Sequence, residues 1–239
     1  MPDDRLPTPE RVLVVAAHPD DIEFGAAGTV SRWVAEGAEA RYLLATNGDK
    51  GSDDPAADAA ELGRRRQREQ RNAAREIGVH VVDFLDEPDG QLEVSLALRE
   101  RITRAIRAFR PEVVMTHDPT VVFVNNEWVN HPDHRALGQV TVDAVFPTAR
   151  DPLNFPQHLA DGLQPWKVAE LFLWSTNEAN QIVDISDTLE AKISALACHE
   201  SQFHDFNETA RWLRRRAEEL GERTGFRAAE GFRRVMLAQ

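Results

Sequence analysis

An alternation of short apolar runs with helical segments constrains the fold of this chain more than any other feature. β-Branched and other apolar residues predict strands over residues 11–17, 40–45, 79–84 and 111–116. Segments with helical spacing separate them, at residues 25–36, 60–77 and 94–109. This alternation favours parallel strands joined by right-handed crossovers. We therefore expect an α/β fold in which a mostly parallel sheet carries helices on both faces.

The rest of the chain is less regular. We expect a helix over residues 133–145, an irregular proline-containing segment over 146–166, strands over 168–174 and 181–185, and helices over 187–199 and 208–221. Residues 229–237 receive no assignment. The length of 239 residues suits one large domain, so we predict a single domain over 11–239 behind a flexible, polar N-terminal tail over 1–10.

Composition excludes several classes of function. The net charge of −12 leaves no basic surface for a nucleic-acid partner. No run of 18 apolar residues is present, so we expect no membrane span. The first residues lack the pattern of a secretory signal, and the single cysteine, Cys198, suits a reducing cytoplasm. Cys198 lies in an apolar helical run, which favours a buried structural thiol over a nucleophile.

Two clusters of histidine and carboxylate residues stand out. His18, Asp20, Asp21 and Glu23 follow the first predicted strand, and residues 130–134 (Asn-His-Pro-Asp-His) form the second cluster. A single His-Pro-Asp is explained equally well as a turn. Turns alone do not explain two such clusters in one chain, because a turn does not require this concentration of histidine and aspartate. The polar residues Asn47, Asp89 and His117 also follow strands, at the sheet edge where doubly wound folds bind ligands.

The clusters contain the groups needed for metal-assisted hydrolysis of an amide. His18, Asp21 and His134 supply the three ligands of a catalytic Zn²⁺ or another divalent first-row metal. Asp20 remains as the general base, although adjacent Asp20 and Asp21 could exchange roles. His131 is the candidate proton donor or oxyanion stabiliser, and Asp133 the candidate group that orients its ring.

Other catalytic motifs are missing. A dinucleotide site needs G-x-G-x-x-G after the first strand, where this chain has His-Pro-Asp-Asp instead. No phosphate-binding P-loop is present, and no G-x-S-x-G marks a serine hydrolase. These absences leave the metal site as the chemistry that the sequence favours.

Residues 17–29 (Ala-His-Pro-Asp-Asp-Ile-Glu-Phe-Gly-Ala-Ala-Gly-Thr) and 131–135 (His-Pro-Asp-His-Arg) resemble the PIG-L/LmbE-like zinc-dependent de-N-acetylases. The loop 46–51 and residues 88–90 and 199–202 are also similar to that family. The resemblance implies a Rossmann-like α/β fold and removal of an N-acetyl group from a glucosamine-type sugar conjugate. It implies the same ligands and catalytic groups as above, with Arg66, Asp89 and Asn47 as substrate-binding residues.

One feature departs from the family. Several relatives place a tyrosine that helps to bind the oxyanion before the second cluster, whereas the only tyrosine here is Tyr42, in a predicted strand. Asn126, Trp128 or Asn130 must then fill that space. The alternatives are hydrolysis of a different amide, such as a thiol conjugate, and a sugar-binding protein without turnover. A homo-oligomer is left open.

Overall fold

The computed structural model describes residues 6–238, which form a seven-stranded sheet in the order β3-β2-β1-β4-β7-β9-β8. The strands are β1 (Arg11–Ala16), β2 (Glu39–Thr46), β3 (Val81–Glu87), β4 (Val113–His117), β7 (Glu170–Trp174), β8 (Gln181–Asp184) and β9 (Ala229–Met236). β3, β2, β1, β4 and β7 pair in parallel, and β9 pairs antiparallel with both β7 and β8. The predicted α/β fold with a mostly parallel sheet is confirmed.

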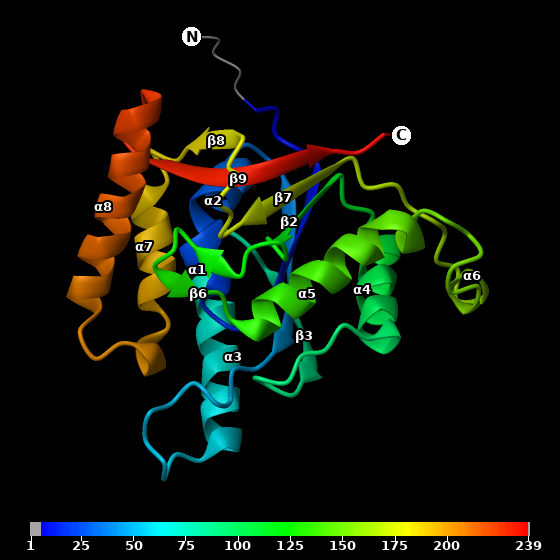
Figure 1. Cartoon of the computed structure of the whole chain (residues 1–239), viewed down its shortest axis with the longest axis horizontal. Helices are drawn as coiled ribbons and strands as arrows, with labels where there is room; N and C mark the ends of the chain where they lie inside the picture. The colour runs from blue at the N-terminus through cyan, green and yellow to red at the C-terminus, as the bar shows by residue number, and fades with distance from the viewer. Residues whose placement is uncertain (1–5, 239) are drawn as a thin grey trace.

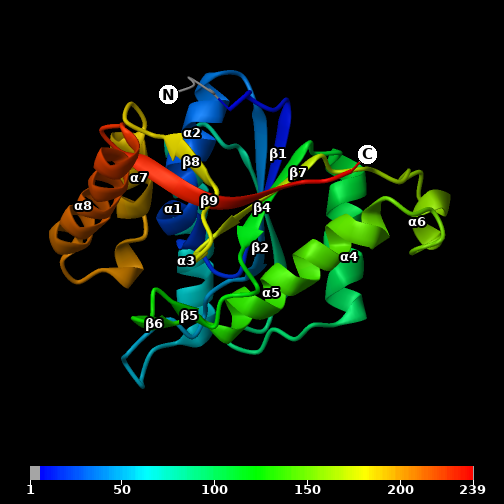
Figure 2. The same ribbon diagram turned by 45° about the horizontal axis from the view of Figure 1, so that its top comes forward.

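Helices cover both faces of this sheet (Figure 1). One face carries α1 (Asp21–Gly25), α2 (Ala27–Ala35), α3 (Ala59–Glu76) and α7 (Leu189–Ala197), and the other carries α4 (Leu96–Phe109) and α5 (Pro132–Asp143), with an irregular helical turn at Ala144–Ala149. The long helix α8 (Phe206–Thr224) packs against α7 and β9, as Figure 2 shows. Smaller elements are β5 (Phe123–Val124), β6 (Trp128–Val129), α6 (Gln157–Ala160) and a 3₁₀ turn at Glu200–Gln202.

The central strands are apolar on both sides because both of their faces are covered. In β1, Val12 and Val14 belong to the core under α2 and α3, whereas Leu13 and Val15 belong to the core under α4 and α5. Successive side chains of a strand point to opposite faces, so a buried parallel strand needs apolar residues at consecutive positions. This requirement explains the continuous apolar run that predicted β1.

The order of the strands creates the site. From β1 the chain adds β2 and β3 on one side, and it then returns to place β4 on the other side of β1. The loops that follow β1 and β4 therefore leave the sheet in opposite directions. Doubly wound folds bind ligands at this switch point, outside the carboxyl ends of the strands.

Two segments differ from the prediction, and a third agrees with it. The single helix predicted over residues 25–36 is two helices, α1 and α2, which are separated at Ala26 by a non-helical φ of −144°. Most of the unassigned residues 229–237 form strand β9 (Ala229–Met236), which lies between β7 and β8. The segment over 146–166 is irregular as predicted, apart from the short helix α6.

Residues 1–5 of the predicted N-terminal tail lie outside the described residues. Within the remainder of that tail, Leu6 and Pro9 are buried, and the backbone N–H of Glu10 donates to Glu112 at 2.7 Å. Among residues 6–238, no helix combines the length and the apolar character that a lipid bilayer requires of a spanning segment.

Candidate functional site

The two predicted clusters meet at the switch point. His18 and Asp21 follow β1, and His134 lies in the first turn of α5, 3.0 Å from Asp21 between Nε2 and Oδ1. The ring of His18 lies 5.3 Å from the ring of His134 between centroids, and its Nδ1 is 3.4 Å from Asp21 Oδ2. The structure thus brings together all three residues that the sequence proposed as metal ligands.

The hydrogen bond between His134 and Asn130 indicates that this site favours a cation. The amide oxygen of Asn130 lies 3.2 Å from His134 Nδ1, and as an acceptor it requires Nδ1 to carry a hydrogen. In the neutral ring, Nε2 then carries a lone pair instead of a hydrogen, and this lone pair faces a carboxylate oxygen of Asp21. Two acceptors at this distance need a positive charge between them, from a proton or a metal ion. Imidazole and carboxylate ligands of this kind fit zinc.

Further carboxylates surround His18. Its Nε2 is 3.1 Å from Asp89 Oδ1 and 3.2 Å from Asp133 Oδ2. Burial alone would lower the pKa of His18, but the hydrogen bonds to Asp133 and Asp21 outweigh it and raise that pKa to about 12. The concentration of negative charge strongly favours a cation here. Among residues 6–238, three overlapping groups could hold an ion: His18, His131 and His134; Asp21, His117 and His134; and His18, Asp89 and Asp133.

The predicted partner of Asp133 is wrong. Its carboxylate accepts the backbone N–H groups of Gly90 at 2.8 Å and Leu92 at 3.2 Å, and it faces His18 rather than His131. The reason is the position of Asp133 in the first turn of α5, where its side chain points back toward the loop after β3. Asp133 therefore orients His18.

His131 caps the same helix. Its Nδ1 accepts the backbone N–H of Asp133 at 3.2 Å, so the hydrogen of the neutral ring lies on Nε2. Burial and the neighbouring His18 lower the pKa of His131, although the charge of Asp133 acts to raise it. His131 lines the pocket as an exposed residue. A neutral ring with an Nε2–H is a hydrogen-bond donor to a substrate.

Asp20 lies beside the ligand cluster in an unusual backbone conformation. Its φ is 90°, a left-handed value that non-glycine residues rarely adopt. Gln70 supports it by accepting the Asp20 backbone N–H at 3.0 Å, and the guanidinium of Arg66 lies 3.2 Å from the Asp20 carboxylate. Burial raises the pKa of Asp20 to about 6, against the opposing effect of Arg66. A carboxylate with such a pKa suits a general base near neutral pH.

A pocket of about 220 Å³ opens in front of these groups. Its lining includes the expected substrate residues Arg66 and Asp89, together with Lys50, which the sequence analysis did not single out. Asn47 is not part of this lining. Its side-chain oxygen instead accepts the backbone N–H of Asp49 at 3.1 Å, which fixes the local turn. The expectation that Asn47 binds substrate is therefore not supported by its position.

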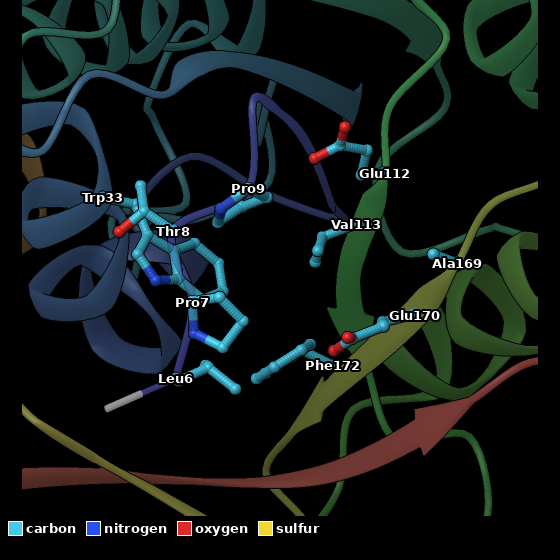
Figure 3. A pocket seen from close by; sticks show the side chains of 10 residues that line it. All are labelled: Leu6, Pro7, Thr8, Pro9, Trp33, Glu112, Val113, Ala169, Glu170 and Phe172. Atoms are coloured by element: carbon cyan, nitrogen blue, oxygen red, sulfur yellow. The ribbon is translucent and has the colours of Figure 1, made fainter. Parts of the chain in front are cut away.

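A larger pocket, of about 320 Å³, lies near the start of β4 and β7, at the opposite edge of the sheet (Figure 3). Trp33, Val113 and Phe172 form part of its wall, and the carboxylates of Glu112 and Glu170 lie on one side. Its lining contains no histidine. The chemistry of the two clusters is therefore confined to the smaller pocket.

Two residues behind the site, His117 and Glu23, stood out in the sequence only by their positions after strands, and no role was predicted for either. His117 is buried at the end of β4, where burial lowers its pKa to about 4, and its ring stacks on His134 with centroids 4.0 Å apart. Glu23 is also buried, between His199 Nε2 at 3.1 Å and Gln70 Nε2 at 2.9 Å. The position of His117 at a strand end was the only available signal, because its contacts come from segments far apart in the sequence.

Comparison with known proteins agrees with this geometry. The family model "PIG-L: GlcNAc-PI de-N-acetylase" matches residues 13–145. The diacetylchitobiose deacetylase of Thermococcus kodakarensis is 34% identical over 95% of this chain and 83% of its own length. The solved N,N'-diacetylchitobiose deacetylase of Pyrococcus horikoshii is 32% identical, with a TM-score of 0.88 over 95% of this chain and 84% of that one.

A third relative is the 1D-myo-inositol 2-acetamido-2-deoxy-alpha-D-glucopyranoside deacetylase of Kineococcus radiotolerans. It is 32% identical over 71% of this chain, and the chain spans 53% of its length. These relatives are deacetylases, hydrolases of the carbon–nitrogen bond of an amide. The family model covers both clusters of the site, and on that ground the chain belongs to the PIG-L/LmbE-like de-N-acetylase family.

Proposed function

We propose that this protein is a metal-dependent hydrolase that removes the N-acetyl group from an N-acetylglucosamine-type sugar conjugate. The observation that carries the proposal is the position of Asp20, whose side chain is 17% exposed and has a pKa of about 6, beside a histidine–aspartate cluster that favours a cation. A protein that only binds sugar has no need of a base at this position.

His18, Asp21 and His134 would hold the metal, and zinc is the ion that their donor atoms fit best. Zinc bound by such residues supplies Lewis-acid chemistry, which polarises a carbonyl group and acidifies water. Asp20 accepts the proton of the attacking water and can return it to the leaving amine. The neighbouring Arg66 and the Gln70 bond to its backbone hold Asp20 in place for this transfer.

His131 stabilises the negative charge that develops on the amide oxygen. Its Nδ1 is occupied by the helix cap, so its Nε2–H is the donor that remains for the substrate. The family tyrosine has no counterpart here: Tyr42 is fully buried in β2. Asn130 does not fill its place either, because its side chain bonds Val121 and His134. The other two candidates, Asn126 and Trp128, are exposed and are not part of the pocket lining. We therefore assign the role of oxyanion donor to His131.

The size of the pocket limits what it can enclose. Sites that enclose a drug-sized ligand span roughly 300–1,000 Å³. The pocket in front of Asp20 is smaller, about 220 Å³, so we infer that it encloses the acetamido sugar and leaves the rest of the conjugate outside. Arg66 and Asp89 line it, and in this proposal they contact the sugar. The names of the diacetylchitobiose and acetamido-glucopyranoside relatives support this substrate class.

The test is acetate release from N-acetylglucosamine conjugates, including diacetylchitobiose and an inositol-linked sugar. We expect activity that a chelator removes and that added zinc, or another divalent first-row metal, restores. The Asp20→Asn variant is the matched control, since it should bind metal without turnover. Activity that ignores the chelator would contradict the metal mechanism. Turnover of other amides but of no acetamido sugar would contradict the substrate class.

A further inference from the structure

The buried residue His117 has no part in the proposed reaction, yet it lies directly behind the proposed metal ligands. Its side chain is 1% exposed. Nε1 of Trp174, at the end of the neighbouring strand β7, lies 3.0 Å from His117 Nδ1. On the other side of the ring, His117 Nε2 lies 3.3 Å from Asp21 Oδ2. The three side chains therefore form a continuous line from the sheet to the site.

The contact with Trp174 determines where His117 carries its hydrogen. An indole nitrogen can only donate, so His117 Nδ1 must accept, and in the neutral ring the hydrogen lies on Nε2. The backbone N–H of Ala17 is also directed at Nε2, at 3.3 Å, and favours the opposite tautomer. The tautomer with its hydrogen on Nε2 satisfies two contacts, the shorter one from Trp174 and the one to Asp21, whereas the opposite tautomer satisfies only the contact from Ala17. Nε2 therefore donates to Asp21.

The two carboxylate oxygens of Asp21 have different partners: one accepts hydrogen bonds from the protein, and the other faces His134. Oδ2 accepts the backbone N–H of His18 at 2.7 Å and faces the Nε2–H of His117. Oδ1 faces Nε2 of His134 at 3.0 Å. Two donors therefore hold one oxygen, and the other is turned toward the proposed metal position.

We propose that Trp174 and His117 form a positioning relay for the metal site: the indole N–H of Trp174 fixes the tautomer of His117, and His117 holds Asp21 with one oxygen free for the metal. In this arrangement His117 is not itself a metal ligand. The inference rests on the proposed function for the identity of the ligands. Groups that orient a ligand in this way typically contribute 10–100-fold to metal affinity.

Close approaches around the relay leave it little freedom to move. A Cβ added to Gly25, at the end of α1, would lie 2.7 Å from the Trp174 ring. A Cβ added to Gly138, in α5, would lie 2.5 Å from the backbone oxygen of His117. The ring of His117 also stacks on His134, so it is held by α5 as well as by β7. Both glycines are needed for these helices to come so close.

The experiment measures zinc binding in the absence of substrate, for the wild type and for His117→Leu, His117→Gln and Trp174→Phe. The matched control is Trp166→Phe, which removes another indole N–H bond, the 2.7 Å bond to the backbone oxygen of Pro111, away from the site. Dissociation constants come from competition with a chromophoric chelator, X-ray absorption at the zinc edge counts the imidazole ligands, and melting of the metal-free proteins measures stability.

We expect His117→Leu to weaken zinc binding by about 10–100-fold and Trp174→Phe by about tenfold. Trp166→Phe should change stability but not zinc affinity. His117→Gln should bind more tightly than His117→Leu, because its amide N–H can still donate to Asp21. The wild type and every variant should show two imidazole ligands, those of His18 and His134. If His117→Leu does not fold, His117→Gln gives the same ligand count and Trp174→Phe the same comparison of affinities.

A third imidazole in the wild type that disappears in the His117 variants would overturn the relay, because His117 would then be a ligand. Equal zinc affinity in Trp174→Phe and Trp166→Phe would also overturn it. The outcomes that contradict the relay differ from those that contradict the proposed function. Zinc binding that follows the relay without any acetate release contradicts only the function, whereas acetate release with unchanged affinity in Trp174→Phe contradicts only the relay.

Discussion

The backbone N–H of Asp133 donates to the ring of His131, while the carboxylate of Asp133 faces His18. One residue thus sets the orientation of two histidines with different proposed roles. Asp133→Asn keeps the backbone bond but replaces a carboxylate oxygen that now faces His18. We expect a roughly tenfold loss of zinc affinity, the usual scale for a group that orients a ligand. Competition with a chelator measures it, and an unchanged affinity would contradict the assignment.

His131→Ala separates the oxyanion donor from the ligand. Because Asn126, Trp128 and Asn130 do not line the pocket, we expect kcat to fall by about a hundredfold or more. Zinc content should stay at the wild-type level, since His134 rather than His131 is the proposed ligand. The contrasting variant is His134→Ala, which should lose metal. Elemental analysis of both proteins decides, and a metal-free His131→Ala would mean that the two histidines are assigned the wrong way round.

The raised pKa of Asp20 leads to a prediction for the acidic limb of the pH–rate profile. A base works in its deprotonated form, and burial raises the pKa of Asp20 to about 6, so the rate should fall as the pH drops through about 6. Asp20→Asn should lower kcat by roughly 10²–10⁴-fold and keep its metal. Rates between pH 5 and 10 and zinc content test both statements. A near-wild-type rate in Asp20→Asn would show that another group is the base.

The buried pair of His199 and Glu23 predicts a pH-dependent stability. Burial alone would lower the pKa of His199, but the hydrogen bond to Glu23 and its charge raise it. A raised pKa stabilises the folded state below the unfolded value of about 6.5, and this contribution is lost as pH rises through the folded pKa. His199→Leu should cost about 3–5 kcal/mol near pH 6 and less near pH 9.

Urea unfolding at both pH values measures the effect. The control is His204→Leu, because His204 is exposed, and its cost should stay within about 0.5 kcal/mol at both. An equal cost for His199→Leu at pH 6 and pH 9 would show that the charge of His199 does not contribute.

We expect Arg107 to stabilise the irregular segment before β7. Its guanidinium, which is 1% exposed as part of the residue, lies within hydrogen-bond distance of five backbone oxygens between residues 148 and 155. Arg107→Leu removes the guanidinium donors from all five oxygens, of which those of Ala149, Asp151 and Phe155 keep a backbone donor. We expect a loss of roughly 3 kcal/mol or more. Arg104→Leu removes an exposed ion pair with Asp161 and should cost about 0–1 kcal/mol. Denaturant unfolding compares the two variants, and equal losses would contradict the role of Arg107.

The sequence predicted those parts of the fold that depend on local pattern. The parallel strands were visible because a strand that is covered on both faces must be apolar throughout, as in β1. Strand β9 was not, because Glu230, Arg233 and Arg234 interrupt its pattern. The structure explains these charges: Glu230 accepts the backbone N–H groups at the start of α2, and Arg234 pairs with Glu170 on β7. Their partners lie too far away in the sequence to be inferred.

The site shows the same division. The sequence grouped His18, Asp21 and His134 because the two His/Asp clusters together supply the ligands of a catalytic metal site. It assigned Asp133 to His131, its neighbour in sequence, because the distance to His18 was unknown before the loops were placed. Proximity along a chain predicts a backbone contact, which Asp133 does make with His131, but not where the side chain points.

Because β9 lies between β7 and β8, the strands cannot join the sheet in the order in which they are synthesised. A ribosome makes β8 more than 40 residues before β9. Within residues 6–238, however, β8 pairs only with β9, so it cannot join the sheet until β9 has been made. The nascent chain must therefore wait with the outer edge of β7 unpaired, and an open strand edge can pair with other chains. Synthesis that pauses within α8 should expose this edge and favour aggregation, although both clusters of the catalytic site have already left the ribosome.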